Sequence, residues 1–443
     1  MSPTAIRPRV MVPGAATPPS EDRLLFVNAT QVVTCDGPPR ARRGAEMRDL
    51  GIRTGTAVAV EHERITAVGP QDELERAFPA ARRIDCRRMV LMPGLVDSHT
   101  HALFGKPRHE EQELRASGLD YMEIARRGGG IHASVRDLRM RGEDELVALA
   151  LPRLARIASH GTTTVEVKSG YGLTVEDELK MLRAIRRLAD TVPLRLVPTW
   201  LGAHEIPLEH RGSPQSREAY LALLEHEMLA AVMAEKLAVF ADIFCEPGVY
   251  TVEESRRILG AAAAAGLSLK LHADELQPAG GAELAAELGA VSADHLGAVS
   301  DSGVRALAAS DTVATLLPHT LFFLGKSSQA PARALIDAGA AIALASDFNP
   351  GTSPTVNFPL VLTLAVSQLR LTVAEAVIAA TVNGAAALGL AHDTGRIAAG
   401  ASADLALFEI DDIRELPYWS GDRRCRGSWA RGKPCHQYEL GVA

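Results

Sequence analysis

The sequence has little cysteine and no long hydrophobic run. Its 443 residues include five cysteines, an odd number, and no two of them form a Cys-x-x-Cys pair. This usage argues against a disulfide framework and is typical of a reducing compartment, so we expect a cytoplasmic protein. No uncharged apolar stretch reaches about 18 residues, so no transmembrane helix is predicted.

An excess of charge of one sign is also missing. The formal net charge is −7, from 47 Lys and Arg against 54 Asp and Glu, with no basic stripe and no block of like charge. We therefore expect a small-molecule substrate, and neither nucleic acid nor a membrane as a partner. The first 20 residues are rich in Pro and Ala but lack a continuous apolar region, so residues 1–23 are expected to form a flexible tail and not a signal peptide.

Eight short apolar runs alternate with segments of helical composition between residues 89 and 389. Apolar strands that alternate with helices indicate a parallel sheet buried on both faces, and eight such units predict a (β/α)8 barrel. A doubly wound open sheet is the alternative, but the count of eight and the absence of Gly-x-Gly-x-x-Gly after the first run disfavour it. The runs are Met89–Asp97, Thr162–Val167, Leu194–Trp200, Val239–Cys245, Leu267–His272, Ala290–His295, Thr312–Leu317 and Ala341–Ser346. The expected helices are 142–159, 175–190, 216–236, 252–265, 279–288, 300–309, 328–338 and 372–388.

Both ends of the chain have a different texture, with short strand candidates between single Gly and Pro residues. Residues 24–88 and 390–443 are expected to build one small β-sandwich beside the barrel, and the chain is expected to end in a short tail. The predicted fold is therefore a (β/α)8 barrel with a small β-sandwich made from both chain ends. The strand candidates are Leu24–Thr34, Ala57–Glu61, Arg64–Val68, Arg83–Cys86, Asp404–Phe408 and Gly427–Arg431.

Two histidines, His99 and His101, stand at the end of the first apolar run. Residues i and i+2 of a strand point to the same face, so both imidazoles would aim at one spot, as a divalent metal requires. The fifth run ends in His272, the sixth in His295, and Asp347 follows the eighth. Since the working face of a barrel lies at the carboxyl ends of its strands, these side chains are expected to meet there. Three or four histidines with an aspartate suit Zn²⁺ or Fe²⁺ and leave a position for water.

Such a metal site indicates hydrolysis. A metal-bound water has a lowered pKa and attacks at neutral pH, but it needs a base to take its proton and an acid to protonate the leaving nitrogen. Asp347 can bind the metal and accept the proton, Glu275 can donate to the leaving group, and His295 can polarise the water or a substrate carbonyl.

One metal is favoured over two. Some hydrolases of this shape bridge two metals with a carboxylated lysine at the end of strand four, but here the fourth run ends in Phe244, Cys245 and Glu246. Lys168, after the second run, is expected to be structural or an ion-pair partner.

The segment 93–101, PGLVDSHTH, resembles the strand-one signature of the amidohydrolase superfamily, which implies the fold and the metal but not the substrate. Further stretches are similar to one family, the imidazolonepropionases of histidine degradation. The resemblance runs from about Leu24 to Lys433. Its stretches are 104–108 with 113–115, 125–131, 166–172, 201–204, 272–275, 292–296 and 347–351.

The resemblance implies a reaction and a set of site residues. The family opens the five-membered ring of 4-imidazolone-5-propanoate to N-formimidoyl-L-glutamate, and it is usually dimeric. One Zn or Fe ion per chain would be bound by His99, His101, His272 and Asp347. An arginine fork matches a carboxylate in bidentate fashion, which suits Arg108 to the propanoate tail. The positions implied in substrate binding are Arg108, Tyr121, Tyr171, His204, Glu275, Asn349, Gly351 and Thr352.

Two places depart from the family pattern. His319 stands in the strand-seven loop, where the family more often has a small residue, and Gln277-Pro278 follows Glu275. Both leave the metal ligands intact and bear on the shape of the pocket near strands five and seven. The Gly-rich stretch 127–130 lacks the Lys-Ser/Thr of a phosphate loop and is expected to be a flap over the site or a turn.

Two other functions stay open from the sequence. Another mononuclear amidohydrolase, such as a deaminase of guanine or a related heterocycle, would use the same metal but would not need Arg108 to bind a carboxylate. The second is a non-catalytic scaffold that retains the barrel, and the intact ligand set argues against it.

Overall fold

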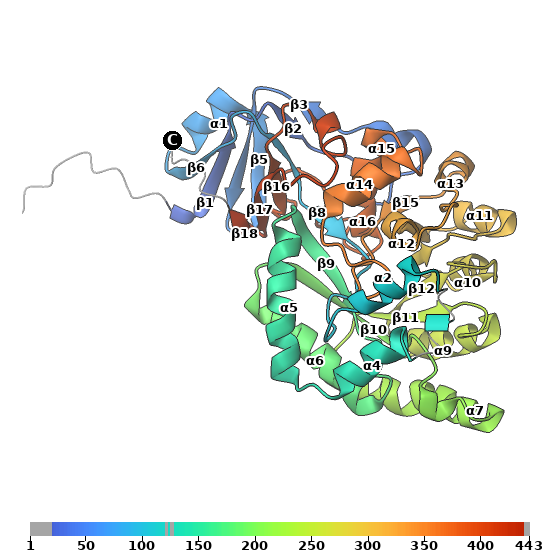
Figure 1. The fold of residues 1–443 in the computed structure, drawn as a ribbon. Coiled ribbons are helices and arrows are strands. Elements are labelled where there is room, and N and C mark those ends of the chain that lie inside the picture. Colours follow the sequence, from blue (N-terminus) through green and yellow to red (C-terminus); the bar gives the residue numbers. More distant parts are fainter. Residues whose placement is uncertain (1–19, 120–122, 125–127, 438–443) are drawn as a thin grey trace, which may run out of the picture.

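The computed structural model describes residues 20–119, 123–124 and 128–437, and its main body is a barrel of eight parallel strands (Figure 1). Neighbouring strands pair in chain order from the first to the eighth. The first and the last are joined beyond their ends, where the Asp347 N–H donates to the His99 carbonyl over 3.1 Å and the His101 N–H to the Phe348 carbonyl over 2.9 Å. The strands are β8 (Leu95–Asp97), β9 (Thr162–Lys168), β10 (Arg195–Ala203), β11 (Phe240–Cys245), β12 (Ser268–Ala273), β13 (Ser292–His295), β14 (Val313–Leu316) and β15 (Ile342–Leu344).

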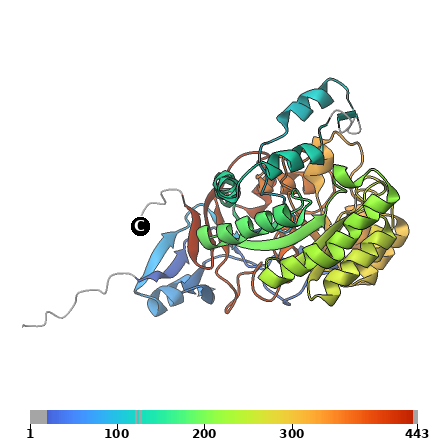
Figure 2. The same cartoon turned by 90° about the horizontal axis from the view of Figure 1, so that it is seen from below.

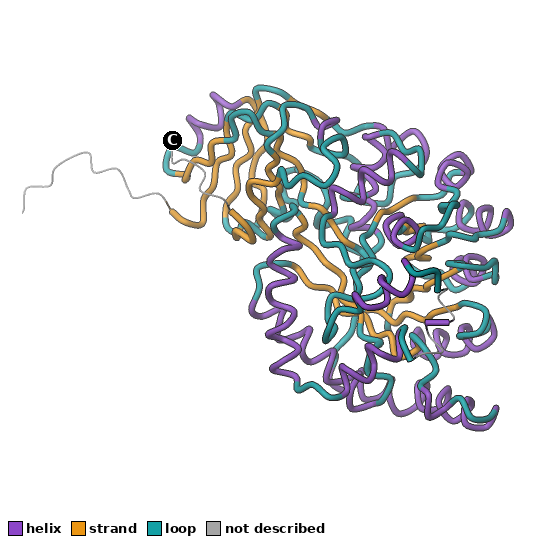
Figure 3. The backbone as a smooth tube through the Cα atoms, in the orientation of Figure 1, coloured by secondary structure: helices purple, strands orange, loops and turns teal. Residues whose placement is uncertain are grey.

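Helices lie outside the strands (Figure 3). Several begin at side-chain caps; at the start of α9, the Thr251 hydroxyl accepts from the Glu254 N–H over 3.2 Å, and the Glu254 carboxylate accepts from the Thr251 N–H over 2.9 Å. Such a box satisfies backbone donors that the first helical turn leaves free. The helices at predicted positions are α5 (Glu143–Ala158), α6 (Val175–Thr191), α7 (Pro214–Ala222), α8 (Leu229–Glu235), α9 (Val252–Ala264), α10 (Gly281–Glu287), α11 (Asp301–Ala308), α13 (Ala332–Ala338), α15 (Val373–Ala379) and α16 (Val382–Ala386).

One predicted helix is wrong in extent. The segment 216–236 is helical from α7 through α8, as predicted, with a wide helical turn at Leu223–Met228 between them. The segment 372–388 breaks at Thr381, whose backbone leaves the helical region while its hydroxyl donates to the Val377 carbonyl over 2.6 Å. Five further helices are not predicted from the sequence: α1 (Gln71–Ala77), α2 (His109–Ala116), α4 (Ile131–Arg139), α12 (Pro318–Phe323) and α14 (Phe358–Ser367).

Strands from the two chain ends lie side by side next to the barrel, as the blue and red arrows of Figure 1 show. One sheet has the order β5-β4-β1-β6 and the other β18-β17-β16-β7-β2-β3. Phe26 of β1 and Trp429 of β17 meet edge to face, with ring centroids 4.9 Å apart, so side chains of both sheets share one core. This arrangement confirms the predicted fold class. The strands are β1 (Ser20–Val27), β2 (Gln31–Val33), β3 (Ile52–Arg53), β4 (Thr56–Glu61), β5 (Arg64–Pro70), β6 (Ala81–Asp85), β7 (Val90–Pro93), β16 (Leu405–Phe408), β17 (Cys425–Ala430) and β18 (Lys433–Gln437).

The predicted strand Met89–Asp97 is two strands. Val90–Pro93 pairs with β16 and β2 beside the barrel, whereas Leu95–Asp97 pairs with β9 inside it. The change of partner occurs at Gly94, where a Cβ atom would lie 2.1 Å from the Thr163 hydroxyl oxygen. Both strands are buried, so the apolar run continues through the break and hides it.

The chain between β8 and β9 covers one end of the barrel. Figure 2 shows the teal segment with α2 projecting beyond that end. Of the Gly-rich stretch, the described residues 128–130 form a turn that leads into α4, in which the Gly129 N–H donates to the Ile124 carbonyl over 3.0 Å. In the described part of the chain, no helix has both the length and the apolar character that a membrane span requires.

Candidate active site

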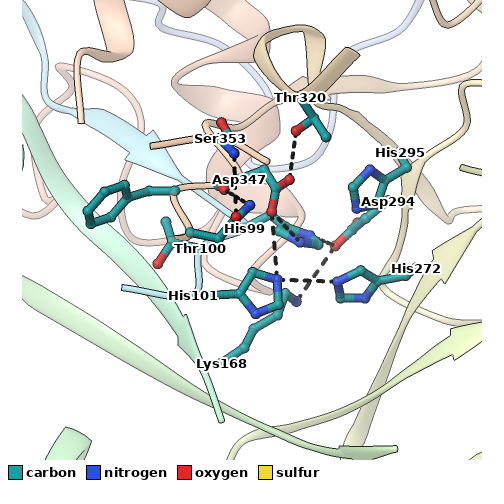
Figure 4. Close-up of polar contacts among 12 residues, drawn as sticks. His99, Thr100, His101, Lys168, His272, Asp294, His295, Thr320, Asp347 and Ser353 are labelled. Carbon is teal, nitrogen blue, oxygen red and sulfur yellow. Dashed lines mark hydrogen bonds and ion pairs between the residues drawn. The ribbon is translucent and has the colours of Figure 1, made fainter. Parts of the chain in front are cut away.

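The four predicted metal ligands converge at the carboxyl ends of β8, β12 and β15 (Figure 4). Asp347 Oδ1 lies 3.6 Å from Nε2 of His99 and 3.6 Å from Nε2 of His101. Nε2 of His101 is in turn 3.4 Å from Nε2 of His272. His99, His101 and Asp347 offer ligand atoms within 4.8 Å of one another, and His272 joins them through its contact with His101. All four side chains are buried.

The protonation of His99 suits a metal ligand. Its Nδ1 lies 2.6 Å from Asp294 Oδ2, which places the proton on Nδ1 and leaves the Nε2 lone pair available. Nε2 is buried and has no hydrogen-bond partner among the described residues. Burial and the nearby Lys168 charge hold the pKa of His99 well below its ordinary value, so the ring is neutral. An orphaned, neutral imidazole nitrogen in this position fits a metal ion.

A buried ion network supports the ligands from below. Lys168 Nζ lies 2.7 Å from Asp242 and 2.8 Å from Glu166, and Asp242 Oδ2 is 3.0 Å from Nδ1 of His272. Lys270 Nζ donates to the Ser98 carbonyl over 2.8 Å, next to His99. Burial opposes the charge of Lys168, but the carboxylates of Asp242 and Glu166 outweigh it and raise the pKa of Lys168. Lys168 is thus an ion-pair partner, as expected.

Asp347 is held in a defined orientation. The Thr320 hydroxyl donates to Asp347 Oδ2 over 2.6 Å, so Oδ1 is the oxygen that faces His99 and His101. The backbone of Asp347 has φ 52°, a region that residues other than glycine rarely adopt. Burial raises the pKa of Asp347 to about 6, and the Thr320 hydrogen bond acts in the opposite direction.

Glu275 and His295 flank the cluster. Oε1 of Glu275 lies 3.8 Å from Nδ1 of His295, whose ring centroid is 5.3 Å from that of His99. Burial, followed by the negative charges of Asp347 and Glu246, raises the pKa of Glu275 to about 8. A carboxyl group that is still protonated at neutral pH is suited to donate a proton.

On the other side, His204 stacks on His101 with centroids 4.9 Å apart and the rings 14° from parallel. Its Nδ1–H donates to the Gly170 carbonyl over 2.9 Å, so Nε2 carries the lone pair. Tyr171 lies 5.4 Å from His204 and 5.9 Å from His101 between ring centroids. Burial, with contributions from nearby positive groups that include Arg108, lowers the pKa of His204 to about 3.

Arg108 is buried against the loop that follows β15. Its backbone N–H donates to the Pro350 carbonyl over 3.0 Å. A Cβ atom on Gly351 would lie 1.6 Å from Arg108 Nη2. Arg108 Nε forms an ion pair with Glu111 Oε1 over 3.2 Å, and Nη1 donates to the Ser134 hydroxyl over 3.4 Å. A buried guanidinium has five N–H donors, so these two contacts leave donors that suit an anionic ligand.

Comparison with known proteins decides between the open alternatives. A sequence model of the amidohydrolase family matches residues 122–436, and a model of the imidazolonepropionase-like composite domain of bacteria matches residues 57–81. The protein named imidazolonepropionase from Symbiobacterium thermophilum is 50% identical over 402 residues, which cover 90% of this chain and 93% of that protein. The one from Geobacillus kaustophilus is 46% identical over 405 residues, with 90% and 95% covered. The chain belongs to the imidazolonepropionase family.

Solved structures share the fold of this imidazolonepropionase family member at lower identity. An adenosine deaminase from Xanthomonas campestris with bound zinc superposes with a TM-score of 0.68 and 19% identity, covering 96% of both chains. A triazine hydrolase variant superposes with a TM-score of 0.67 and 18% identity, covering 95% of this chain and 96% of that one. These likenesses confirm the barrel and carry no information on the substrate.

The remaining residues that the imidazolonepropionase resemblance implies lie on the loop after β15 or outside the described residues. Asn349 organises the loop, because its Oδ1 accepts from the N–H groups of Gly351 and Thr352 over 2.8 and 2.7 Å. Its Nδ2 lies 2.9 Å from the Thr352 hydroxyl, so Asn349 and Thr352 bond to each other. Tyr121 lies outside the described residues.

His319, one of the two departures from the family, packs against the same loop. Its Nδ1 lies 2.8 Å from the Ser353 hydroxyl, which donates to the Ser346 carbonyl over 2.6 Å. Thr320, the next residue of α12, bonds Asp347, so one short helix fixes this loop at two points. Burial lowers the pKa of His319 to about 4, which keeps the ring neutral.

Four residues that support the site have no role predicted from the sequence: Asp242, Asp294, Thr320 and Glu246. A signal exists for Asp294, which is a carboxylate inside the apolar run 290–295 and therefore needs a buried partner. Thr320 gives no such signal, since threonine in a short loop is common. For Glu246, the sequence shows only that strand four ends in a glutamate and lacks a metal-bridging lysine.

Proposed function

We propose that this chain hydrolyses 4-imidazolone-5-propanoate to N-formimidoyl-L-glutamate, in histidine degradation. Its relatives named imidazolonepropionase, 44–50% identical over about nine-tenths of the chain, carry the proposal. The buried Arg108 near the histidine cluster supports it, because a deaminase of an uncharged ring has no need of a guanidinium there. Water adds across the cyclic amide: its C–N bond breaks, the carbonyl carbon becomes a carboxylate, and the ring nitrogen takes a proton.

His99, His101, His272 and Asp347 would hold one Zn²⁺ or Fe²⁺/Fe³⁺ ion per chain. The ion would supply Lewis-acid chemistry, lowering the pKa of water and polarising the substrate carbonyl. Asp347, with its carboxylate fixed by Thr320, is placed to take the proton of the attacking water. This assignment is supported by the orientation of the carboxylate, whose Oδ2 accepts from Thr320 while Oδ1 lies 3.6 Å from Nε2 of both His99 and His101.

Glu275 would give its proton to the leaving ring nitrogen. The pKa of about 8 supports the role, since burial and neighbouring carboxylates keep the group protonated near pH 7. His295 would polarise the substrate carbonyl or the water from the same side. Its pKa is lowered by burial and by His272, so it would act as a neutral imidazole.

Substrate recognition would use the opposite wall. Arg108 would bind the propanoate carboxylate, while Tyr171 and His204 would bind the ring. The stacking of His204 on His101 supports a ring site directly beside the metal ligands. Asn349, Gly351 and Thr352 would shape the pocket beside Arg108, and Tyr121 would complete it.

We further propose that the protein is cytoplasmic and forms a homodimer. The cytoplasmic location is supported by the five free cysteines, four of them buried, which suit a reducing compartment. The dimer rests on the family resemblance alone, and light scattering of the purified protein tests it.

The direct test is an assay of purified protein with freshly made imidazolone propanoate, followed by the loss of ring absorbance and by detection of N-formimidoyl-glutamate. Guanine and hydantoins serve as control substrates, and a chelator-treated sample serves as the metal-free control. We expect turnover of imidazolone propanoate only, and its loss in the metal-free sample. Turnover of guanine in its place would identify a deaminase.

A further inference from the structure

Glu246 lies at the end of β11, and its carboxylate is turned toward backbone. Oε2 accepts from the Glu275 N–H over 3.0 Å, and Oε1 accepts from the N–H groups of Gln277 and Leu276 over 2.9 and 3.3 Å. The residue is only 3% exposed. A buried carboxylate thus receives three consecutive backbone donors, with no positively charged side chain in the set.

The next residues of the same loop are held by a second carboxylate. Asp274 Oδ1 accepts from the N–H groups of residues 279, 280 and 281, and Oδ2 accepts from that of residue 282 over 2.9 Å. The remaining residue, Pro278, has no N–H group. Every backbone donor from Glu275 to Ala282 is therefore bound by Glu246 or Asp274. The unusual Gln277-Pro278 pair fits this division, because the proline stands where neither carboxylate needs to reach.

This loop carries the side chain that we assign as the proton donor. Glu275 is the second residue after β12, and its carboxyl group lies 3.8 Å from His295. The peptide N–H of Glu275 is itself one of the three groups that Glu246 holds. Moving that peptide would move the carboxyl group, and a displacement of about 1 Å at a reacting group can cost on the order of a hundredfold in rate.

We propose that Glu246 is a positioning residue for Glu275, acting through the backbone of residues 275–277. The proposal rests on the proposed function, in which Glu275 is the proton donor. Glu246, at the end of strand four, would thus affect catalysis without contacting the metal or the substrate. A carboxylate is suited to it, because its two oxygens offer about four acceptor sites and no donor.

The Glu246→Gln variant tests the idea, since an amide keeps the shape but replaces one acceptor with an NH₂ group that faces backbone N–H donors. In metal-loaded enzyme we expect kcat to fall by about tenfold or more while KM stays within about twofold, as for a lost charge-assisted contact that acts on the chemical step. Metal content should equal that of the parent. Glu253→Gln, an exposed carboxylate at the start of α9, is the matched control and should change neither constant.

A double-mutant cycle separates positioning from a general structural role. If Glu246 acts through Glu275, adding Glu246→Gln to a Glu275→Gln enzyme should cause little further loss of kcat. The proposal would be overturned if the losses of kcat from the two single variants multiply in the double variant, or if Glu246→Gln alone loses metal. If Glu246→Gln does not fold, Glu246→Asp keeps the charge but shortens the reach, and the same cycle applies to it.

Amide hydrogen exchange tests the clamp without activity. In the parent enzyme the amides of residues 275–277 should be protected, and the variant at position 246 should lose that protection while residues 279–282 keep theirs. Unprotected amides at 275–277 in the parent would refute the clamp. An enzyme with these protected amides but no turnover of imidazolone propanoate would instead refute the proposed function.

Discussion

His99 Nδ1 lies 2.6 Å from Asp294 Oδ2, and both side chains are fully buried. The contact joins the segment just after β8 to β13 and fixes which nitrogen of His99 is left for a metal. Asp294 Oδ2 also lies 3.8 Å from the ammonium groups of Lys168 and Lys270, so two buried positive charges balance its negative charge. The ligand and its support therefore form one unit with the ion network beneath the site.

Asp294→Asn should weaken metal binding by about 10- to 100-fold, because outer partners of ligating histidines fix the tautomer and raise the basicity of the ring. The measurement is competition with a chromophoric chelator, which reports affinity independently of turnover. Asp301→Asn, an exposed carboxylate at the start of α11, is the control and should leave the affinity unchanged. Parent-like affinity in Asp294→Asn would refute the role of Asp294.

Arg108→Ala should raise KM for imidazolone propanoate by about tenfold or more, since a charge-assisted hydrogen bond is worth roughly 1.5–3 kcal/mol. Metal content should not change, because Arg108 contacts the loop after β15 and none of the four ligands in the described contacts. Steady-state kinetics check this, with Lys106→Ala as the exposed control cation nearby. An unchanged KM would remove Arg108 from substrate recognition.

The pH dependence of kcat should have an alkaline limb that belongs to Glu275. The pKa of this carboxyl is raised to about 8, so the proton that it donates is present below that pH and is lost as pH rises through it. Activity should fall on the alkaline side with a slope of about one. Glu275→Gln should lower kcat strongly at neutral pH, keep the metal and lack this limb. The same limb in the variant would assign the titration to another group.

The sequence predicts those parts of the site that depend on local geometry. His99 and His101 share a face because they are two residues apart in an extended segment, and His272 and Asp347 join them because all parallel strands of a barrel end at one face. Contacts between distant segments could not be predicted in this way. That Glu246 binds the backbone of residue 275 depends on the register of β11 against β12, which periodicity does not define.

The fold shows the same limit. Continuous apolar strands identify the barrel, but the run 89–97 carries no sign that Val90–Pro93 changes sheets, because both of its environments are buried. Helix α12 is also invisible to periodicity, since Pro318–Phe323 is six residues long and mostly buried, and so shows no polar face. Its contact with Asp347 is one of those that orient the site.

Thr320→Val should separate the shape of Thr320 from its hydrogen bond. The hydroxyl donates to Asp347 Oδ2 over 2.6 Å, and valine keeps the volume while leaving that buried oxygen without its donor. We expect kcat and metal affinity each to fall by about tenfold, in line with a lost bond to a charged group. Thr320→Ser, which retains the hydroxyl, should restore both. Equal losses in the serine variant would show that packing of the methyl group is what counts.

Gly351→Ala should reproduce the Arg108 defect without touching the arginine. A Cβ atom at position 351 would lie 1.6 Å from Arg108 Nη2 and 2.2 Å from its Cζ, so the guanidinium must move aside. Because the end of a long side chain gives way more easily than backbone, we expect the melting temperature to stay within a few degrees while KM rises by about tenfold. Gly212→Ala is the control, since a Cβ there meets nothing within 4 Å. A normal KM in Gly351→Ala would mean that the carboxylate is bound elsewhere, whereas a large loss of stability would mean that the loop and not the arginine yields.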